Sequence, residues 1–185
     1  MQNRCFWVND DPLYIEYHDN EWGKPVYDDE TLFEFLLLES FQAGLSWITI
    51  LKKRENFREA FDNFNYKKIA NYNQDKYDEL IVNAGIIRNK LKVKSAITNA
   101  QLFMKIQKEF GSFSKYIWSF LEGKPIVNTF DIREDVPATT LLSDKISKDL
   151  KKRGFKFVGS TIMYAFMQAT GMVNDHTTDC FCYSL

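Results

Sequence analysis

Potential metal ligands at the two ends of the chain most constrain how it can fold. The chain of 185 residues contains only two histidines, His18 and His176, and each lies near a cysteine in the sequence. Cys5 precedes His18 by thirteen positions, and Cys180 follows His176 by four. Two cysteines and two histidines form a closed tetrahedral ligand set of the kind found in structural zinc sites. If these residues bind one zinc ion, the two terminal segments, about 1–20 and 174–185, must lie together.

Two alternatives to this zinc site stay open. The four side chains can be scattered surface residues, and Cys182 is a rival of Cys180, although the spacing of His176 and Cys180 fits a helical turn or tight loop better. Four protein ligands leave no position for a catalytic water, so the metal is expected to be structural. Because both histidines would then be ligands, any acid or base must be a carboxylate, lysine, tyrosine or water.

Composition predicts one folded domain over residues 1–185. A hydrophobic fraction of 45% with 26% charged residues is typical of globular chains. No apolar run approaches the roughly 18 residues of a membrane span, and no secretory signal is visible at the N-terminus. Three cysteines are an odd number, which argues against a disulfide framework. We therefore expect a cytoplasmic protein that does not associate with a membrane.

Apolar residues recur at helical spacing, and alternation typical of strands is scarce, which predicts an all-α domain. The expected helices are one from about Leu32 that Gly44 ends, one from Trp47 to Phe61 with Ser46 as N-cap, residues 74–84, residues 88–109, a short helix closed by Trp118 and Phe120, residues 141–153, and a buried helix that Gly171 ends. Glycine-linked helices over about 74–108 predict a helix-hairpin-helix, whose turn can direct backbone N–H groups at a phosphate. The stretch "RGFKFVGS" partly matches an RNA-recognition strand, but its helical surroundings argue against that fold.

Basic residues form clusters although the net charge is only −1. The clusters are Lys52 to Arg54; Arg88, Lys90, Lys92 and Lys94; and Lys148, Lys151, Lys152 and Arg153. Each can be a solvated helix face. Three such clusters in one neutral chain nevertheless make a polyanion partner possible, because attraction to phosphate is local.

Aromatic residues and one carboxylate suggest a binding pocket. Trp7, Tyr14, Tyr17 and Trp22 fall within sixteen residues, and Trp47 follows the apolar helix that contains Glu39. These rings can be core packing, and Glu39 can be a helix-end residue that reaches solvent. Alternatively, the rings form a box for a flat cationic ligand, whose charge Glu39 complements. A buried glutamate without such a partner would be costly.

Five segments, in order along nearly the whole chain, resemble the Tag family of 3-methyladenine DNA glycosylases. They are "CFWVNDDPLYIEYHDNEWG", "LESFQAGLSWITILKKRENF", "AGIIRNKLKV", "LKKRGFKFVGSTIMYAFMQATGMVNDH" and the terminal Cys180. The resemblance implies a helix-hairpin-helix enzyme that flips 3-methyladenine out of alkylated double-stranded DNA and hydrolyses its glycosidic bond. It also implies the zinc ligands Cys5, His18, His176 and Cys180, a structural ion joining the N- and C-terminal segments.

The same resemblance implies roles for individual residues. Glu39 would contact the base and is expected to be catalytic, within a pocket of Trp7, Tyr14, Tyr17, Trp22 and Trp47. Gly44 and Leu45 would fill the gap left by the extruded base. The residues expected to contact DNA phosphates are Lys52, Lys53, Arg88 and Lys90.

Other helix-hairpin-helix glycosylases carry an aspartate after the hairpin. Here "LFMKIQKEFGSFSKY" contains only Glu109, in agreement with the Tag family. We expect a monofunctional, monomeric enzyme, with Lys90 the one candidate for a lyase nucleophile. The alternative class is a zinc-stabilised module that binds damaged DNA without cleaving it.

Overall fold

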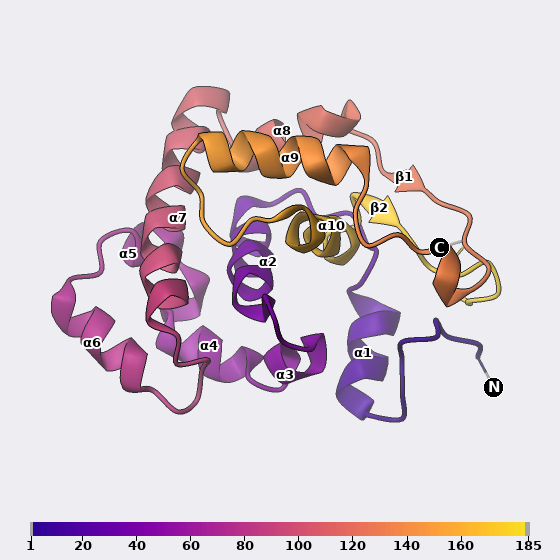
Figure 1. The fold of residues 1–185 in the computed structure, drawn as a ribbon, viewed down its shortest axis with the longest axis horizontal. Coiled ribbons are helices and arrows are strands. Elements are labelled where there is room, and N and C mark those ends of the chain that lie inside the picture. The colour runs from indigo at the N-terminus through magenta and orange to yellow at the C-terminus, as the bar shows by residue number, and fades with distance from the viewer. Residues whose placement is uncertain (1, 184–185) are drawn as a thin grey trace.

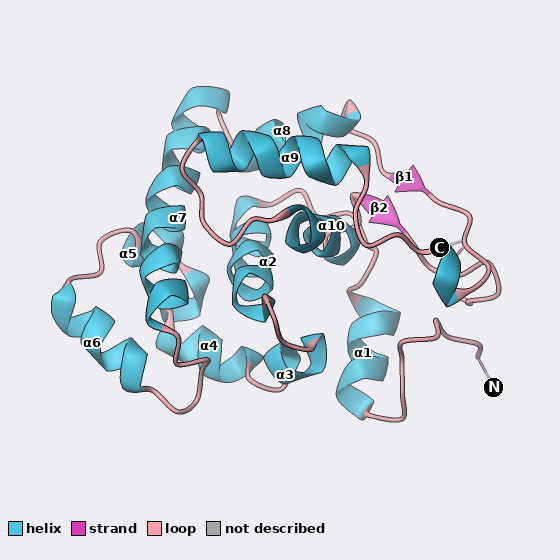
Figure 2. Ribbon diagram, viewed as in Figure 1, coloured by secondary structure: helices cyan, strands magenta, loops and turns pink. Residues whose placement is uncertain are grey.

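The fold is mostly helical, as the sequence predicts. The computed structural model describes residues 2–183, drawn in Figure 1, and Figure 2 marks helices and strands. The helices are α1 (Pro12–Asn20), α2 (Asp29–Gln42), α3 (Trp47–Leu51), α4 (Arg54–Ala60), α5 (Tyr66–Ile69), α6 (Gln74–Val82), α7 (Lys90–Phe110), α8 (Phe113–Trp118), α9 (Leu141–Lys152) and α10 (Ser160–Ala169), with 3-10 turns η1 (Asp62–Phe64), η2 (Ser119–Leu121) and η3 (Arg133–Asp135).

Helix α2 forms the centre of the core. Asp28 caps its N-terminus by accepting a hydrogen bond from the backbone N–H of Thr31, and every residue from Leu32 to Phe41 is buried. A helix that is mostly apolar and buried on all sides must be surrounded by protein. Helices α3, α7, α8 and α10 all contact α2, and Figure 1 shows it between α7 and α10. Polar residues near the end of α2 are therefore held deep inside the molecule.

The segment after α2 differs from its prediction. Two short helices, α3 and α4, replace the single helix expected from Trp47 to Phe61, with a break at residues 52 and 53. Both keep the expected apolar face, since Ile50, Leu51 and Phe57 are buried. The break changes the direction of the chain, because α3 packs on α1 and α2 whereas α4 packs on η1. Apolar spacing alone could not locate this change.

Helices α6 and α7 lie close to the predicted bounds and contact each other across a turn of residues 83–89. Asn89 begins α7 by accepting hydrogen bonds from the backbone N–H groups of Leu91 and Lys92. The buried Ile86 anchors the turn.

The two ends of the chain lie on one side of the molecule, as Figure 1 shows. The backbone N–H of Phe181 donates to the carbonyl of Asn3 at 3.0 Å. Two short strands, β1 (Ile126–Val127) and β2 (Val173–Asn174), pair in parallel nearby. Residues 1, 184 and 185 of the predicted zinc-binding segments lie outside the described residues.

Candidate active site and metal centre

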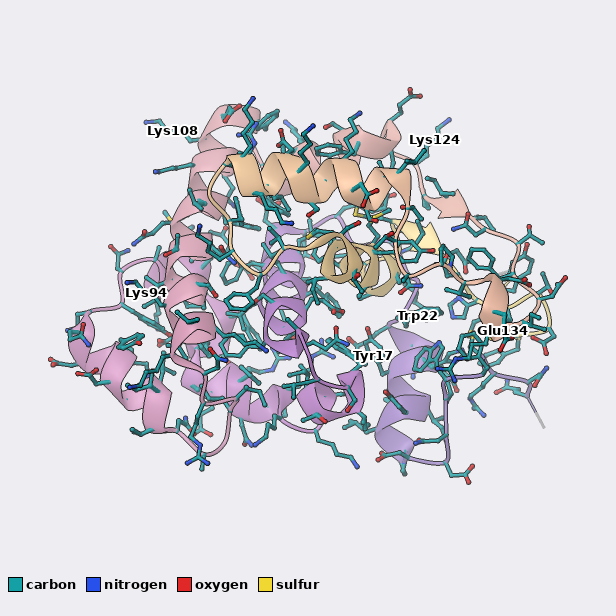
Figure 3. All side chains as sticks on the ribbon, in the orientation of Figure 1. Tyr17, Trp22, Lys94, Lys108, Lys124 and Glu134 are labelled. Atoms are coloured by element: carbon teal, nitrogen blue, oxygen red, sulfur yellow. The ribbon has the colours of Figure 1, made fainter. Side chains whose placement is uncertain are left out.

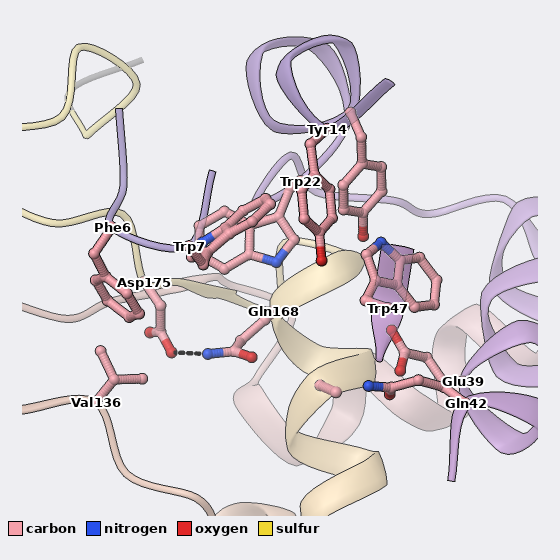
Figure 4. A pocket seen from close by; sticks show the side chains of 12 residues that line it. Phe6, Trp7, Tyr14, Trp22, Glu39, Gln42, Trp47, Val136, Gln168 and Asp175 are labelled. Atoms are coloured by element: carbon pink, nitrogen blue, oxygen red, sulfur yellow. Dashed lines mark hydrogen bonds between the residues drawn. The ribbon is translucent and has the colours of Figure 1, made fainter. Parts of the chain in front are cut away.

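A cavity of about 280 Å³ brings together Glu39 and all five predicted aromatic residues. Figure 4 shows Glu39, Gln42 and Trp47 at one end, and Phe6, Val136 and Asp175 at the other. The complete lining is Phe6, Trp7, Tyr14, Tyr17, Trp22, Glu39, Gln42, Trp47, Val136, Ala165, Gln168 and Asp175. Its walls come from both ends of the chain and from α2, α3 and α10, so the pocket forms only in the folded protein.

Glu39 is a buried carboxyl group in the last turns of α2. The residue is only 3% exposed, and its Oε2 atom has no hydrogen-bond partner among the described residues. Burial raises the pKa of Glu39 to about 8. The carboxyl group therefore holds a proton at neutral pH unless a cation or donor enters the pocket.

The aromatic side chains that line this cavity pack against one another, some edge to face and some tilted. The ring centroids of Trp7 and Trp22 lie 5.0 Å apart, and those of Tyr17 and Trp47 lie 5.4 Å apart. The indole N–H groups of Trp7 and Trp47 are buried and have no acceptor among the described residues. Buried polar groups in proteins are normally paired. Two unpaired donors and an unpaired carboxyl oxygen on residues that line one cavity indicate a flat ligand with several polar atoms.

Six residues of the lining were not predicted. Gln168 and Ala165 come from α10, and Asp175 lies beside the metal-ligand candidate His176. The Nε2 atom of Gln168 donates to Asp175 at 2.8 Å, as Figure 4 shows. Tyr164 and Asn128 also donate to this carboxylate, which is thereby fixed in the wall. The position of Asp175 next to His176 was the one available signal for these residues.

The four predicted metal ligands form a compact, buried cluster. Their ligand atoms all lie within 4.8 Å of one another, although Cys5 and Cys180 are far apart in the sequence. The Nε2 atom of His176 is buried without a partner among the described residues. The Nε2 atom of His18 lies 3.4 Å from Sγ of Cys180. This donor set and the unpaired nitrogen fit a tetrahedral metal ion.

Neighbouring groups orient the two imidazoles for such an ion. The Nδ1 atom of His18 lies 2.8 Å from Asp19 Oδ1, and that of His176 lies 2.9 Å from Asn174 Oδ1. Hydrogen bonds to the other ring nitrogen commonly fix metal-binding histidines. Burial lowers the pKa of His176 to about 4, so the ring is neutral, as a ligand must be. Cys182 belongs to a different group, with His18 and Asp19.

The residues predicted to contact DNA lie in different environments. Gly44 has a φ of +79° with open space where a side chain would begin, since no atom lies within 4 Å of that position. Leu45 is exposed beside it. Arg88 and Lys90 are exposed in and after the α6–α7 turn. Lys53 instead donates to the carbonyl oxygens of Ala84 and Gly85 and holds that turn.

Other basic residues differ in their ion pairing and in their position relative to the pocket. Lys52 pairs with Asp11 at 2.9 Å and stays exposed. Lys94 and Lys108 of α7 lie on the side away from Tyr17 and Trp22, as Figure 3 shows. In residues 2–183 there is no helix whose length and apolar character would let it cross a membrane.

Comparison with known proteins agrees with this geometry. The methyladenine glycosylase family matches residues 7–183. The chain is 49% identical over 180 residues to the DNA-3-methyladenine glycosylase 1 of Escherichia coli (strain K12), covering 97% of this chain and 96% of that protein.

Solved structures agree as well. A crystal structure of a 3-methyladenine DNA glycosylase I matches with a TM-score of 0.95 and 50% identity, over 97% of this chain and 99% of that one. The Staphylococcus aureus enzyme, described for its recognition of 3-methyladenine, matches at 0.93 and 39% identity, over 97% and 96%.

Proposed function

Because the chain belongs to the methyladenine glycosylase family, we propose that it excises 3-methyladenine from double-stranded DNA by flipping the damaged nucleotide into the aromatic pocket. The protein is a DNA-3-methyladenine glycosylase, an enzyme that hydrolyses N-glycosyl bonds. The observation that carries the proposed substrate is the unpaired Oε2 atom of Glu39 in the same ring-lined cavity as two residues with unpaired indole N–H groups. A methylated purine is flat, carries donors and acceptors, and is cationic in the nucleotide.

The chemistry needs few protein groups. Methylation at N3 places a positive charge on the base, so its bond to the sugar is weakened and the base leaves neutral without protonation. Water then adds to the sugar carbon and loses a proton. The ring faces attract the cationic base by roughly 0.5 to 2 kcal/mol each.

The pocket also discriminates against normal adenine. A cation beside Glu39 lowers the pKa of its carboxyl group, so binding favours the carboxylate and strengthens the contact. Neutral adenine gains neither this ion pair nor the full attraction to the rings. Its glycosidic bond also stays strong.

The turn between the end of α2 and the start of α3 is suited to insertion into the DNA duplex. Gly44 and Leu45 connect the helix that carries Glu39 to the helix that begins with Trp47. Both residues are exposed beside the pocket. In the proposed complex they occupy the gap that the flipped nucleotide leaves. Lys52, Arg88 and Lys90 are exposed for phosphate contacts, and the α6–α7 turn supplies the helix-hairpin-helix.

We assign the cluster of Cys5, His18, His176 and Cys180 to a structural zinc ion. The support is the set of four buried ligand atoms within 4.8 Å and the otherwise unpaired Nε2 atom of His176. The ion would supply positive charge and would cross-link the N- and C-terminal segments. The histidines and cysteines then take no part in the excision step.

The deciding experiment is chromatography of the bases released from methylated DNA. We expect wild type to release 3-methyladenine, and both Glu39→Gln and Trp47→Ala to slow release by at least about tenfold, because each removes a contact to a cationic base. Phe110→Ala, an aromatic truncation at the far end of α7, is the matched control and should stay within twofold.

Each outcome has a defined meaning. If wild type binds methylated duplex tightly but releases no base, the protein is a damage-binding module. Full activity of Glu39→Gln removes only the role of Glu39. Nicking of abasic DNA that Lys90→Met abolishes would overturn the monofunctional assignment.

A further inference from the structure

A buried lysine joins the second helix of the proposed hairpin to the helix that carries Glu39. Lys92 lies in the first turn of α7 and is only 5% exposed. Its Nζ atom donates to the carbonyl oxygens of Phe41 and Ala43, each at 2.7 Å. The sequence placed this lysine in a basic cluster available to phosphate. Its burial now excludes a direct contact with DNA.

The surroundings of Lys92 show that the ammonium ion acts as a helix cap. Among residues 2–183, its hydrogen-bond partners are carbonyl groups rather than carboxylates, and burial lowers the pKa of its amine. The last four carbonyl groups of a helix lack partners within the helix and carry partial negative charge. A cation that donates to these carbonyls is stabilised there, and the carbonyls are in turn held in place.

The two acceptor carbonyls flank the residue that joins the pocket to the exposed turn. Phe41 and Ala43 lie on either side of Gln42, which lines the cavity. The carbonyl of Gln42 accepts from the backbone N–H of Leu45 at 2.6 Å, which closes the tight turn. Lys92 therefore fixes the peptide groups between Glu39 on the pocket side and Gly44 and Leu45 on the outer side.

Helix α7 also holds the loop that lies over this ammonium group. The side chain of Asn99 exchanges two hydrogen bonds with the backbone of Lys156, both at 2.9 Å. The next residue, Phe157, has a left-handed φ of +54°, and its ring centroid lies 5.9 Å from Nζ of Lys92. This loop is the "RGFKFVGS" stretch, and the ring of its Phe157 packs near the ammonium group of Lys92.

We propose that Lys92 is a positioning residue for excision: it sets the Gln42–Leu45 turn, relative to α7, in the shape that enters the duplex while Glu39 faces the flipped base. The proposal rests on the proposed glycosylase function. It assigns no chemical step to Lys92, which acts through the turn.

The test compares Lys92→Met with Lys92→Arg, which restores donors to both carbonyls, and with Lys105→Met. Lys105 is an exposed lysine of the same helix and is the matched control for loss of charge. Three quantities are measured: the single-turnover rate of 3-methyladenine release from duplex DNA, the affinity for duplex containing an abasic-site analogue at several salt concentrations, and the affinity for free 3-methyladenine by tryptophan fluorescence.

We expect Lys92→Met to lower the single-turnover rate by roughly 10- to 100-fold, because small displacements of a positioned group have effects of this size. Affinity for free 3-methyladenine should change less than threefold, because the pocket walls remain. The slope of log affinity for DNA against log salt should match wild type, because Lys92 contacts no phosphate. Lys92→Arg should recover most of the rate, and Lys105→Met should stay within twofold.

Several results would overturn the proposal. The proposal is wrong if the excision rate of Lys92→Met lies within twofold of wild type, or if this variant loses excision rate and free-base affinity equally. It is also wrong if the salt slope of Lys92→Met falls by about one unit, as for loss of a phosphate contact. A folded Lys92→Arg that recovers none of the excision rate would contradict it as well. If Lys92→Met does not fold, the rate of Lys92→Arg decides. All of these comparisons require a wild type that releases 3-methyladenine. A wild type that releases none would instead contradict the proposed function itself.

Discussion

At the scale of single residues, Glu39 shows how a costly group can be retained in a core. Its neighbours on α2 are buried and mostly apolar, and no described residue pairs with its Oε2 atom. Burying an unpaired carboxylate is unfavourable, so the free protein keeps the group protonated. The free-energy cost of burying this group is offset only when a ligand supplies the missing hydrogen-bond donor or positive charge.

The pH dependence of stability tests this state of Glu39. Its pKa in the folded protein is about 8, above the ordinary value of 4.5. Between these values the folded state holds more protons than the unfolded state, so the free energy of unfolding falls as pH rises, by at most about 1.4 kcal/mol per pH unit.

Glu39→Gln removes this term. We expect the variant to gain stability over wild type steadily from pH 5 to pH 8 in urea unfolding. Glu79→Gln, at an exposed position of α6, is the control and should follow wild type. Parallel curves for Glu39→Gln and wild type would contradict the assigned protonation state.

At the scale of elements, the turn between α2 and α3 joins the proposed base-binding residue Glu39 to the residues proposed to contact DNA. Leu45→Ala shortens the exposed side chain proposed to fill the gap in the duplex. We expect release of 3-methyladenine from DNA to fall by about tenfold, roughly the effect of losing one buried apolar contact. Binding of free 3-methyladenine should not change. Leu141→Ala, at a 90% exposed position of α9, is the control. Equal loss of free-base binding would place Leu45 in the pocket instead.

A second prediction concerns the end of α10. Gly171 has a φ of +63°, and an added Cβ would lie 2.2 Å from the backbone carbon of Lys24. Gly171→Ala should therefore reduce the free energy of unfolding by at least about 3 kcal/mol, through overpacking and backbone strain. Gly123 has a φ of +79° with nothing within 4 Å, so Gly123→Ala should cost only about 1 kcal/mol. Equal losses in thermal unfolding would show that packing at Gly171 is not tight.

The elements also show what the sequence could predict. Long helices such as α7 and α9 follow from apolar periodicity, because each buries one face. Helix α1 was not predicted, because "PLYIEYHDN" mixes polar and aromatic residues and its partners, such as Trp47 and His176, lie far along the chain. The Gln168 and Asp175 side of the pocket was missed for the same reason: tertiary contacts alone bring it to the aromatic wall.

At the scale of the whole molecule, the cluster of predicted metal ligands brings the two terminal segments together behind the pocket. The ring of Trp22 lies 4.7 Å from that of His176, and the ring of Trp7 lies 5.3 Å from that of His18. The ligand candidates thus pack directly against the aromatic wall. Loss of the proposed ion should therefore loosen the aromatic wall as well as the terminal segments.

Elemental analysis should find about one zinc ion per chain in protein purified without chelator. Cys180→Ser should lose the metal and melt at a lower temperature, because it removes one of four ligands. Cys182→Ser is the matched control and should retain the metal, since Cys182 lies outside the four-residue cluster. Equal metal loss in both variants would make Cys182 a ligand.

The closeness of the two ends has a consequence for biosynthesis. Four rings of the aromatic wall come from residues 7–22, while the groups behind them, His176 and Cys180, are made more than 150 residues later in translation. Until residue 176 has been added, the nascent chain has only half of the predicted metal ligands, and Trp22 lacks its contact with the ring of His176. A nascent chain that lacks these residues can contain α2 and α7 but not a finished pocket, so the ability to excise bases should arise only after residue 180 has been added.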